Sequence, residues 1–140
     1  MHVRAQIRSE IAAALAMPGV AVYVDKIYPL DKGTLPAIII SATGESVERL
    51  TSGRPALQAR EISVEIEVIA SAVAGVSGIL DQICSDIEVA ISTMATIAGD
   101  VQYRNTDIDI TADGERPVGM AVISYTFLIS TLEDNPDLAL

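Results

Sequence analysis

The sequence has 140 residues and is acidic, with 19 Asp and Glu against 9 Lys and Arg and a formal charge of −10. This length is typical of one domain, and the charge repels nucleic acid and anionic membranes, so we expect no DNA-reading function. Half of the residues are apolar, but only 4% are aromatic and none is Trp, which predicts an aliphatic core. The single Cys84 excludes an internal disulfide and a cysteine zinc cluster.

The first half of the chain predicts one helix and two strands before a loop. Apolar residues at three- and four-residue intervals predict a helix from about His2 to Ala16, ended by Pro18-Gly19. Val20 to Val24 is expected to form a short strand, and the Ile-rich stretch Leu35 to Thr43 a central one. The polar stretch Thr51 to Ala59, rich in turn residues, predicts a mobile loop.

A strictly alternating strand is predicted from Glu61 to Ala70, with its apolar side buried and its carboxylates in water. A second helix follows, capped by Ser77 and closed by Gly99. Its buried stripe is predicted to comprise Ile79, Leu80, Ile83, Ile87, Ala90, Ile91 and Met94.

The next strand begins at Val101, and its apolar phase moves from odd to even positions before Ile108. Because one face of a strand repeats every second residue, this shift predicts a bulge. A last strand is expected from Met120 to Ser130, with Ile123, Tyr125, Phe127 and Ile129 on one face.

These elements predict an α+β fold in the order α-β-β-β-α-β-β. We expect a single domain with an antiparallel or mixed sheet of about five strands and both helices packed on one face. The domain is predicted to span residues 1–131, followed by an acidic, disordered tail at 132–140. No apolar run is long enough to span a bilayer, and the first residues lack a secretory signal, so the expected location is the cytoplasm.

Catalytic residues are not evident in the sequence. The only His is His2, which lies too close to the terminus to be held for acid/base work or metal binding. Cys84 lies beside the apolar stripe of the second helix, where packing is favoured over reactivity. Glu61, Glu65 and Glu67 form one strand face, which we interpret as the face that meets water.

One segment partly matches a calcium-binding loop. Asp109, Thr111, Asp113 and Gly114 have the early spacing of such a loop, but the position of its bidentate Glu is occupied by Met120. Asp113-Gly114 is also a common hairpin turn. The sequence therefore predicts no metal, no cofactor and no enzymatic activity.

The element order and several stretches resemble the tail terminator proteins of long-tailed bacteriophages, the group that includes minor tail protein U of lambda-like phages. The likeness covers about residues 2 to 131. It is carried by the N-terminal helix, by Leu35 to Ile40 running into Thr43-Gly44-Glu45, by the strand Glu61 to Ile69, and by the closing stretch Ile123 to Phe127. The chain differs in lacking Trp and in its acidic end.

The resemblance implies a homo-hexameric ring on the head-proximal end of a phage or prophage tail tube. Such a ring stops tube polymerisation and offers a surface to the head-tail connector protein. It is assembled in the bacterial host cytoplasm and then belongs to the virion tail. DNA passes through its lumen without specific binding, no membrane is involved, and acidic side chains facing the lumen would keep DNA from adhering.

Six charged residues are candidates for contacts between subunits or with partners. The cations are conspicuous in an acidic chain, and opposite charges across a boundary can set register and partner choice. Solvated loop charges are an equally good interpretation. The candidates are Arg49, Arg54, Arg60, Asp113, Glu115 and Arg116.

Two other functional interpretations stay open. The chain could be a head-to-tail joining or neck protein of the same assembly, which would share the ring habit but bind the portal side. It could also be a small non-catalytic α+β binding domain of a bacterial protein.

Overall fold

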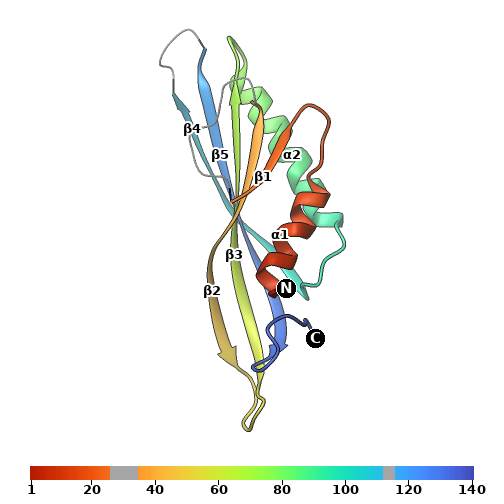
Figure 1. Ribbon diagram of the computed structural model, residues 1–140. Helices are drawn as coiled ribbons and strands as arrows, with labels where there is room; N and C mark the ends of the chain where they lie inside the picture. Colours follow the sequence, from red (N-terminus) through yellow and green to blue (C-terminus); the bar gives the residue numbers. More distant parts are fainter. Residues whose placement is uncertain (26–34, 112–115) are drawn as a thin grey trace.

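A computed structural model describes residues 1–25, 35–111 and 116–140 as a single α+β unit. The order of elements is the predicted one, and the sheet is mixed with five strands, so the predicted fold class is confirmed (Figure 1). Among the described residues, no helix is long and apolar enough to cross a membrane. The elements are α1 Val3–Ala14, β1 Ala21–Val24, β2 Ala37–Arg49, β3 Leu57–Ser71, α2 Val76–Thr93, β4 Asp100–Thr111 and β5 Val118–Leu132.

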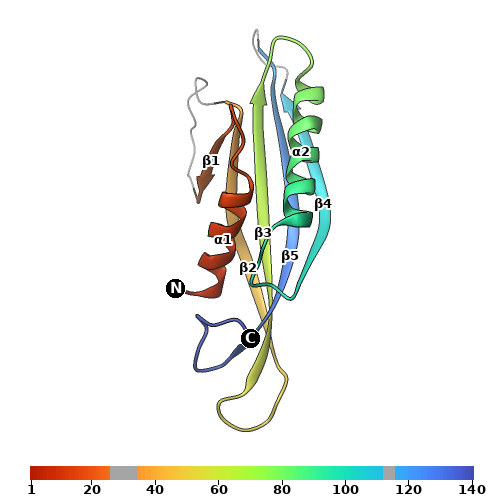
Figure 2. The ribbon, with the colours of Figure 1, turned by 90° about the vertical axis from the view of Figure 1, so that its right-hand side faces the viewer.

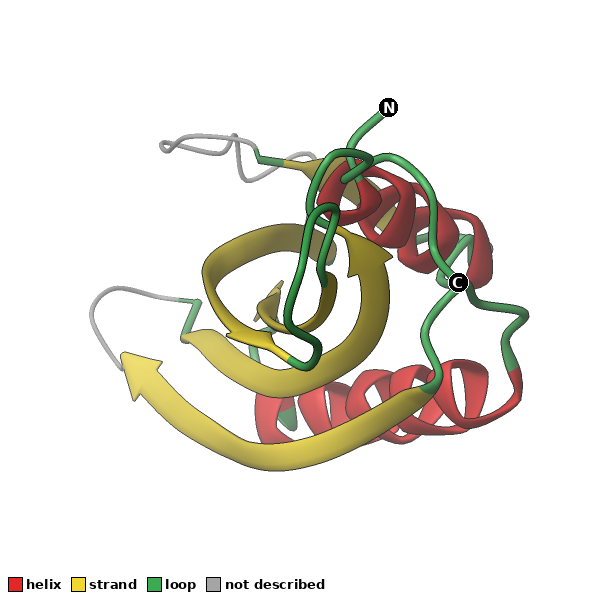
Figure 3. Cartoon of the chain, turned by 90° about the horizontal axis from the view of Figure 1, so that it is seen from below, coloured by secondary structure: helices red, strands yellow, loops and turns green. Residues whose placement is uncertain are grey.

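The sheet has the strand order β1-β2-β3-β5-β4. β1 runs parallel to β2, and the other neighbours are antiparallel. The longest pairing joins β3 to β5, from Leu57 opposite Leu132 to Ser71 opposite Val118. Seen along its strands, the sheet is strongly twisted and curled (Figure 3).

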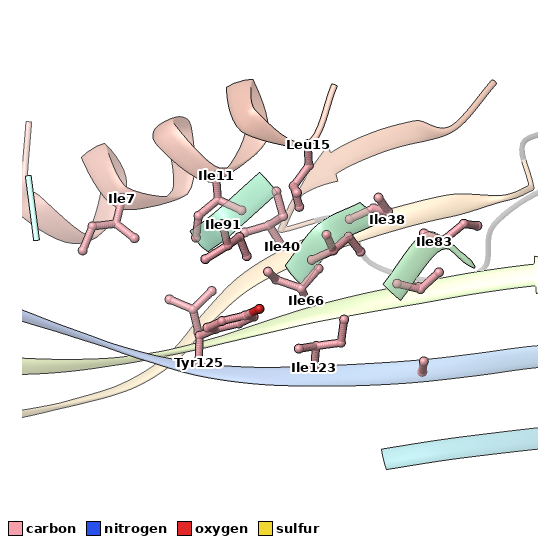
Figure 4. Close-up of a cluster of buried hydrophobic side chains, with 14 of the residues drawn as sticks. Ile7, Ile11, Leu15, Ile38, Ile40, Ile66, Ile83, Ile91, Ile123 and Tyr125 are labelled. Atoms are coloured by element: carbon pink, nitrogen blue, oxygen red, sulfur yellow. The ribbon is translucent and has the colours of Figure 1, made fainter. Parts of the chain in front are cut away.

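Both helices pack on the same face of the sheet, α1 over β1 and β2 and α2 over β3 and β5 (Figure 2). The core between these layers is almost entirely aliphatic, as the composition predicts. Figure 4 shows side chains of both helices meeting those of β2, β3 and β5. Fully buried members include Ile7, Ile11, Leu15, Ile38, Ile40, Ile62, Ile66, Leu80, Ile87, Ile123 and Phe127.

Three details predicted for the second helix are wrong. α2 begins at Val76, after Gly75 in the left-handed region at φ 76°, and no side chain caps it. It ends at Thr93, and the Gly99 N–H instead donates to the Leu128 carbonyl at 2.8 Å, where β4 starts to pair. Ile79 is 38% exposed, because a residue one position from Leu80 is rotated about 100° away from the helix face that touches the sheet.

The β2–β3 hairpin is longer than predicted. β2 continues past the predicted end at Thr43 to Arg49, and β3 begins at Leu57, so the hairpin extends beyond the helices (Figure 1). Of the loop predicted from Thr51 to Ala59, residues 51–56 form the turn and residues 57–59 pair as strand. The remaining turn contains Gly53 at φ 95° and a cis peptide bond before Pro55. The polar end of β2 forms a strand because it pairs with β3. A local sequence pattern cannot predict this, since it contains no information on pairing with a distant segment.

The predicted bulge in the fourth strand is confirmed. The register of β4 against β5 shifts between Tyr103 and Asn105. Val101 pairs opposite the buried Phe127, and after the shift Ile108 pairs opposite the buried Ala121. The bulge therefore keeps the apolar side chains of both halves of β4 on the helix-covered side of the sheet.

Residues after Leu132, expected to form a disordered tail, are placed against α1 and β5. The Glu133 N–H donates to the Ala56 carbonyl at 2.9 Å, and the Leu140 N–H donates to the Ser130 carbonyl at 2.9 Å. The Val3 N–H donates to the Pro136 carbonyl at 3.1 Å. The acidic composition of this segment predicts disorder, because backbone hydrogen bonds to distant parts of the chain cannot be seen in composition.

Candidate functional site

The side chains with potential for chemistry are dispersed. Within the part of the chain that the structure describes, no group of three or more His, Cys, Asp and Glu could hold a metal ion. The His2 Nδ1 accepts a hydrogen bond from the Arg4 backbone N–H at 3.1 Å, at the start of α1. Burial, followed by the charge of Arg4, lowers the pKa of His2. His2 thus closes the first helical turn with a neutral acceptor nitrogen.

Cys84 is half-buried and packs against the core. Burial, with further contributions from Glu88 and Asp81, raises the pKa of its thiol. Because the thiolate is the reactive form, these neighbours disfavour nucleophilic chemistry.

The calcium-like segment falls partly on β4. Asp107 and Asp109 are exposed and pair opposite Val122 and Met120, on the face away from the helices. Asp113 and Gly114 lie outside the described residues. The described part of the segment is therefore an alternating edge strand.

The face of the sheet away from the helices, here called the outer face, is polar and acidic. Glu61 and Glu65 are exposed on β3, and neither helix covers them. The guanidinium of Arg104 lies 3.7 Å from the Glu61 carboxylate, with both side chains about half exposed, which makes this a weak pair. Carboxylates on the outer face of β2, β3 and β4 are Glu48, Glu61, Glu65, Glu67, Asp100, Asp107 and Asp109.

An ion cluster lies beneath the start of α1, on the helix-covered side of the sheet. Arg60 donates to Glu45 at 2.5 Å, to the Thr131 hydroxyl at 2.8 Å and to the Gln58 side chain at 3.2 Å. Arg4 of α1 binds the second carboxylate oxygen of Glu45. The side chains of Glu45 and Arg60 are only 8% and 10% exposed. This Glu45–Arg60 cluster joins α1, β2, β3 and β5.

A bulge between Ala42 and Gly44 creates this cluster, because it turns Glu45 onto the helix-covered face, opposite the buried Ile62. Burial alone would raise the pKa of Glu45, but hydrogen bonds from Arg60 and Arg4 outweigh burial and lower the pKa. The cluster was not predicted from the sequence. The available signal was that Arg60 falls in phase with the alternating apolar residues of the same strand, Ile62, Val64 and Ile66.

The candidate contact residues occupy different environments. Arg60 is buried in the cluster just described, whereas Arg49 and Arg54 are exposed at the end of the hairpin. Arg49 donates to the carbonyls of Thr51 and Gly53 and so braces the turn. The remaining candidates lie at the other end of the sheet or outside the described residues: Arg116 reaches the Ser71 carbonyl at 3.4 Å, and Asp113 and Glu115 are not described.

A groove of about 560 Å³ runs between the second half of α2 and the start of β4. Tyr103 is 46% exposed there and meets the ring of Tyr125 edge-on, with centroids 5.4 Å apart. Glu88 lies on the helix wall. Asp100 borders the strand wall, but its carboxylate accepts a hydrogen bond from the Gln102 side chain at 2.9 Å on the outer face. Burial raises the pKa of Tyr125, and the Glu88 carboxylate raises it further, so its hydroxyl stays protonated. We call this feature the α2/β4 groove.

No family model matches the chain, and no curated protein does. One solved structure to which it is similar is a chain of the virion of a native gene transfer agent particle. The two share 15% sequence identity, the match covers 91% of each chain, and the TM-score is 0.45.

Proposed function

We propose that this chain is a structural protein of a phage or prophage tail, acting as a tail terminator. In this function, six copies form a ring on the head-proximal end of the tail tube, stop its polymerisation and offer a surface for head attachment. The proposal is motivated by the resemblance of the sequence to tail terminator proteins. It is supported by the fold, whose element order is the one expected from that resemblance.

The outer face of the sheet carries the proposal. The helices cover one face only, while along the described strands the other face presents seven carboxylates against the guanidinium of Arg104. In a ring whose sheets face inward, this acidic surface would line the lumen. Like charge would keep the DNA phosphates from adhering during passage.

Termination needs no catalytic residue. A tube grows because the upper face of each ring complements the lower face of the next, and such a head-to-tail series continues until one member lacks the second complementary face. A ring that matches the tube on one side only therefore ends the series. Binding surfaces alone can perform this task.

The test is electron microscopy of particles produced without this gene. Overlong tubes detached from heads would support termination. Tails of normal length that fail to join heads would favour the head-to-tail joining function instead. Complete particles of normal form would contradict both.

A further inference from the structure

The α2/β4 groove lies at the edge of the sheet, and its lining combines apolar side chains with polar ones. α2 packs on β3 and β5 and leaves the helix side of β4 largely open, so Tyr103 in the groove is 46% exposed. Ile108 and Ile110, farther along the same side of β4 and outside the groove, are 56% and 40% exposed. The Glu88 carboxylate lines the groove, and none of its described lining residues is Lys or Arg. Its partner should therefore be apolar and positively charged.

The end of the β2–β3 hairpin, residues 47–58, exposes apolar side chains and has a small excess of cations, Arg49 and Arg54 against Glu48. Val47 and Leu50 are each 49% exposed, and Arg49 and Arg54 lie beside them. Within the described residues Arg54 forms no ion pair. The Arg49 guanidinium donates to backbone carbonyls of the turn and so stiffens it. A braced hairpin loses little conformational entropy when it binds.

We propose that the hairpin end of one copy docks into the α2/β4 groove of the next copy. The hairpin lies beyond the helices (Figures 1 and 2), whereas residues of α2 and β4 line the groove, so the contact joins two different surfaces of the chain. Apolar side chains meet across it, and Arg54 approaches Glu88. A two-fold contact of groove with groove would instead bring carboxylates together. This docking deepens the proposed ring function and rests on it, because a ring is built from head-to-tail contacts whose rotation closes.

Disulfide trapping between two different variants tests the docking. In a Cys84→Ser background, purified Leu50→Cys protein is mixed with purified Tyr103→Cys protein and oxidised. We expect a mixed disulfide dimer, identified by mass spectrometry of the linked peptides. Ser63→Cys, exposed on the outer face, replaces Tyr103→Cys as the matched control. Equal yields from Tyr103→Cys and Ser63→Cys, or no mixed dimer, would overturn the proposal.

Charge reversal supplies a second measurement. Arg54→Glu in the hairpin partner should lower the initial rate of mixed-disulfide formation about fivefold to tenfold, because like charges now meet at the contact. Glu88→Arg in the groove partner should restore most of that rate when it is combined with Arg54→Glu. Failure of Glu88→Arg to restore the rate would place Arg54 elsewhere and contradict the docking geometry.

The docking and the terminator function can fail separately. A mixed disulfide in a protein whose absence leaves tails of normal length would retain the docking and remove the terminator function. Overlong tubes in the absence of the gene, together with no mixed disulfide, would retain the function and remove this interface.

Discussion

Replacing Glu45 with Gln removes one charge from a nearly buried pair while keeping the shape of the side chain. Removing one partner of a buried pair costs about 3–5 kcal/mol, because the other charge is left without compensation. Arg60 would keep its hydrogen bonds to Thr131 and Gln58, so we expect the lower end, about 3 kcal/mol. For a domain of this size that loss corresponds to a fall in Tm of about 9 °C.

The loss should depend on pH. The folded-state pKa of Glu45 lies below its ordinary value of 4.5, so its contribution is present above that value and is lost as the pH falls through the folded pKa. The difference in unfolding free energy between wild type and Glu45→Gln should therefore be full at pH 7 and should shrink below about pH 4.5. Urea unfolding followed by far-UV circular dichroism at pH 7 and pH 3 measures it.

Glu61→Gln is the matched control, since Glu61 is about half exposed and its pair with Arg104 is weak. It should cost less than about 0.5 kcal/mol. Equal losses in the two variants, or a loss for Glu45→Gln that is the same at both pH values, would refute the reasoning. A Glu45→Leu/Arg60→Met double variant should be more stable than either single variant, because no buried charge remains unpaired.

Two further predictions concern packing and thiol chemistry. Gly119→Ala should destabilise the fold by about 1–3 kcal/mol, because the new Cβ would lie 2.6 Å from Cδ1 of the buried Leu80. Gly78→Ala, whose new Cβ would have nothing within 4 Å, should stabilise α2 by about 0.5–1 kcal/mol. Thermal unfolding of both variants distinguishes these opposite results from a uniform effect of adding a methyl group. Cys84 should react with iodoacetamide more slowly at pH 8 than the thiol of a short peptide, and Glu88→Gln should speed the reaction; a Cys84 that labels as fast as the peptide would contradict the raised pKa.

Periodicity was sufficient to predict the apolar architecture. Ile7 and Ile11 on α1, and Ile123 and Phe127 on β5, are buried as the sequence indicates, because burial of one face imposes a fixed repeat on the residues. The bulge in β4 was predicted for the same reason. A shift in the apolar phase is visible only where apolar residues continue on both sides of it.

The polar half of the hairpin could not be predicted in this way. The residues from Glu45 to Arg49 contain one apolar side chain, so no repeat marks them as strand. Their pairing is fixed by β3, and the buried position of Glu45 depends on a bulge that has no apolar phase to reveal it. The α2/β4 groove was also missed, since it depends on which strand α2 leaves uncovered.

Because β3 runs through both parts of the sheet, one strand is held by two kinds of force. Near Ile66 it is fixed by aliphatic packing, which weakens on cooling and is little affected by acid. Near Arg60 it is fixed by the carboxylate of Glu45, whose contribution acid removes. Amide hydrogen exchange along β3 should therefore divide the strand in acid, with the hairpin half opening first while the half under α2 stays protected.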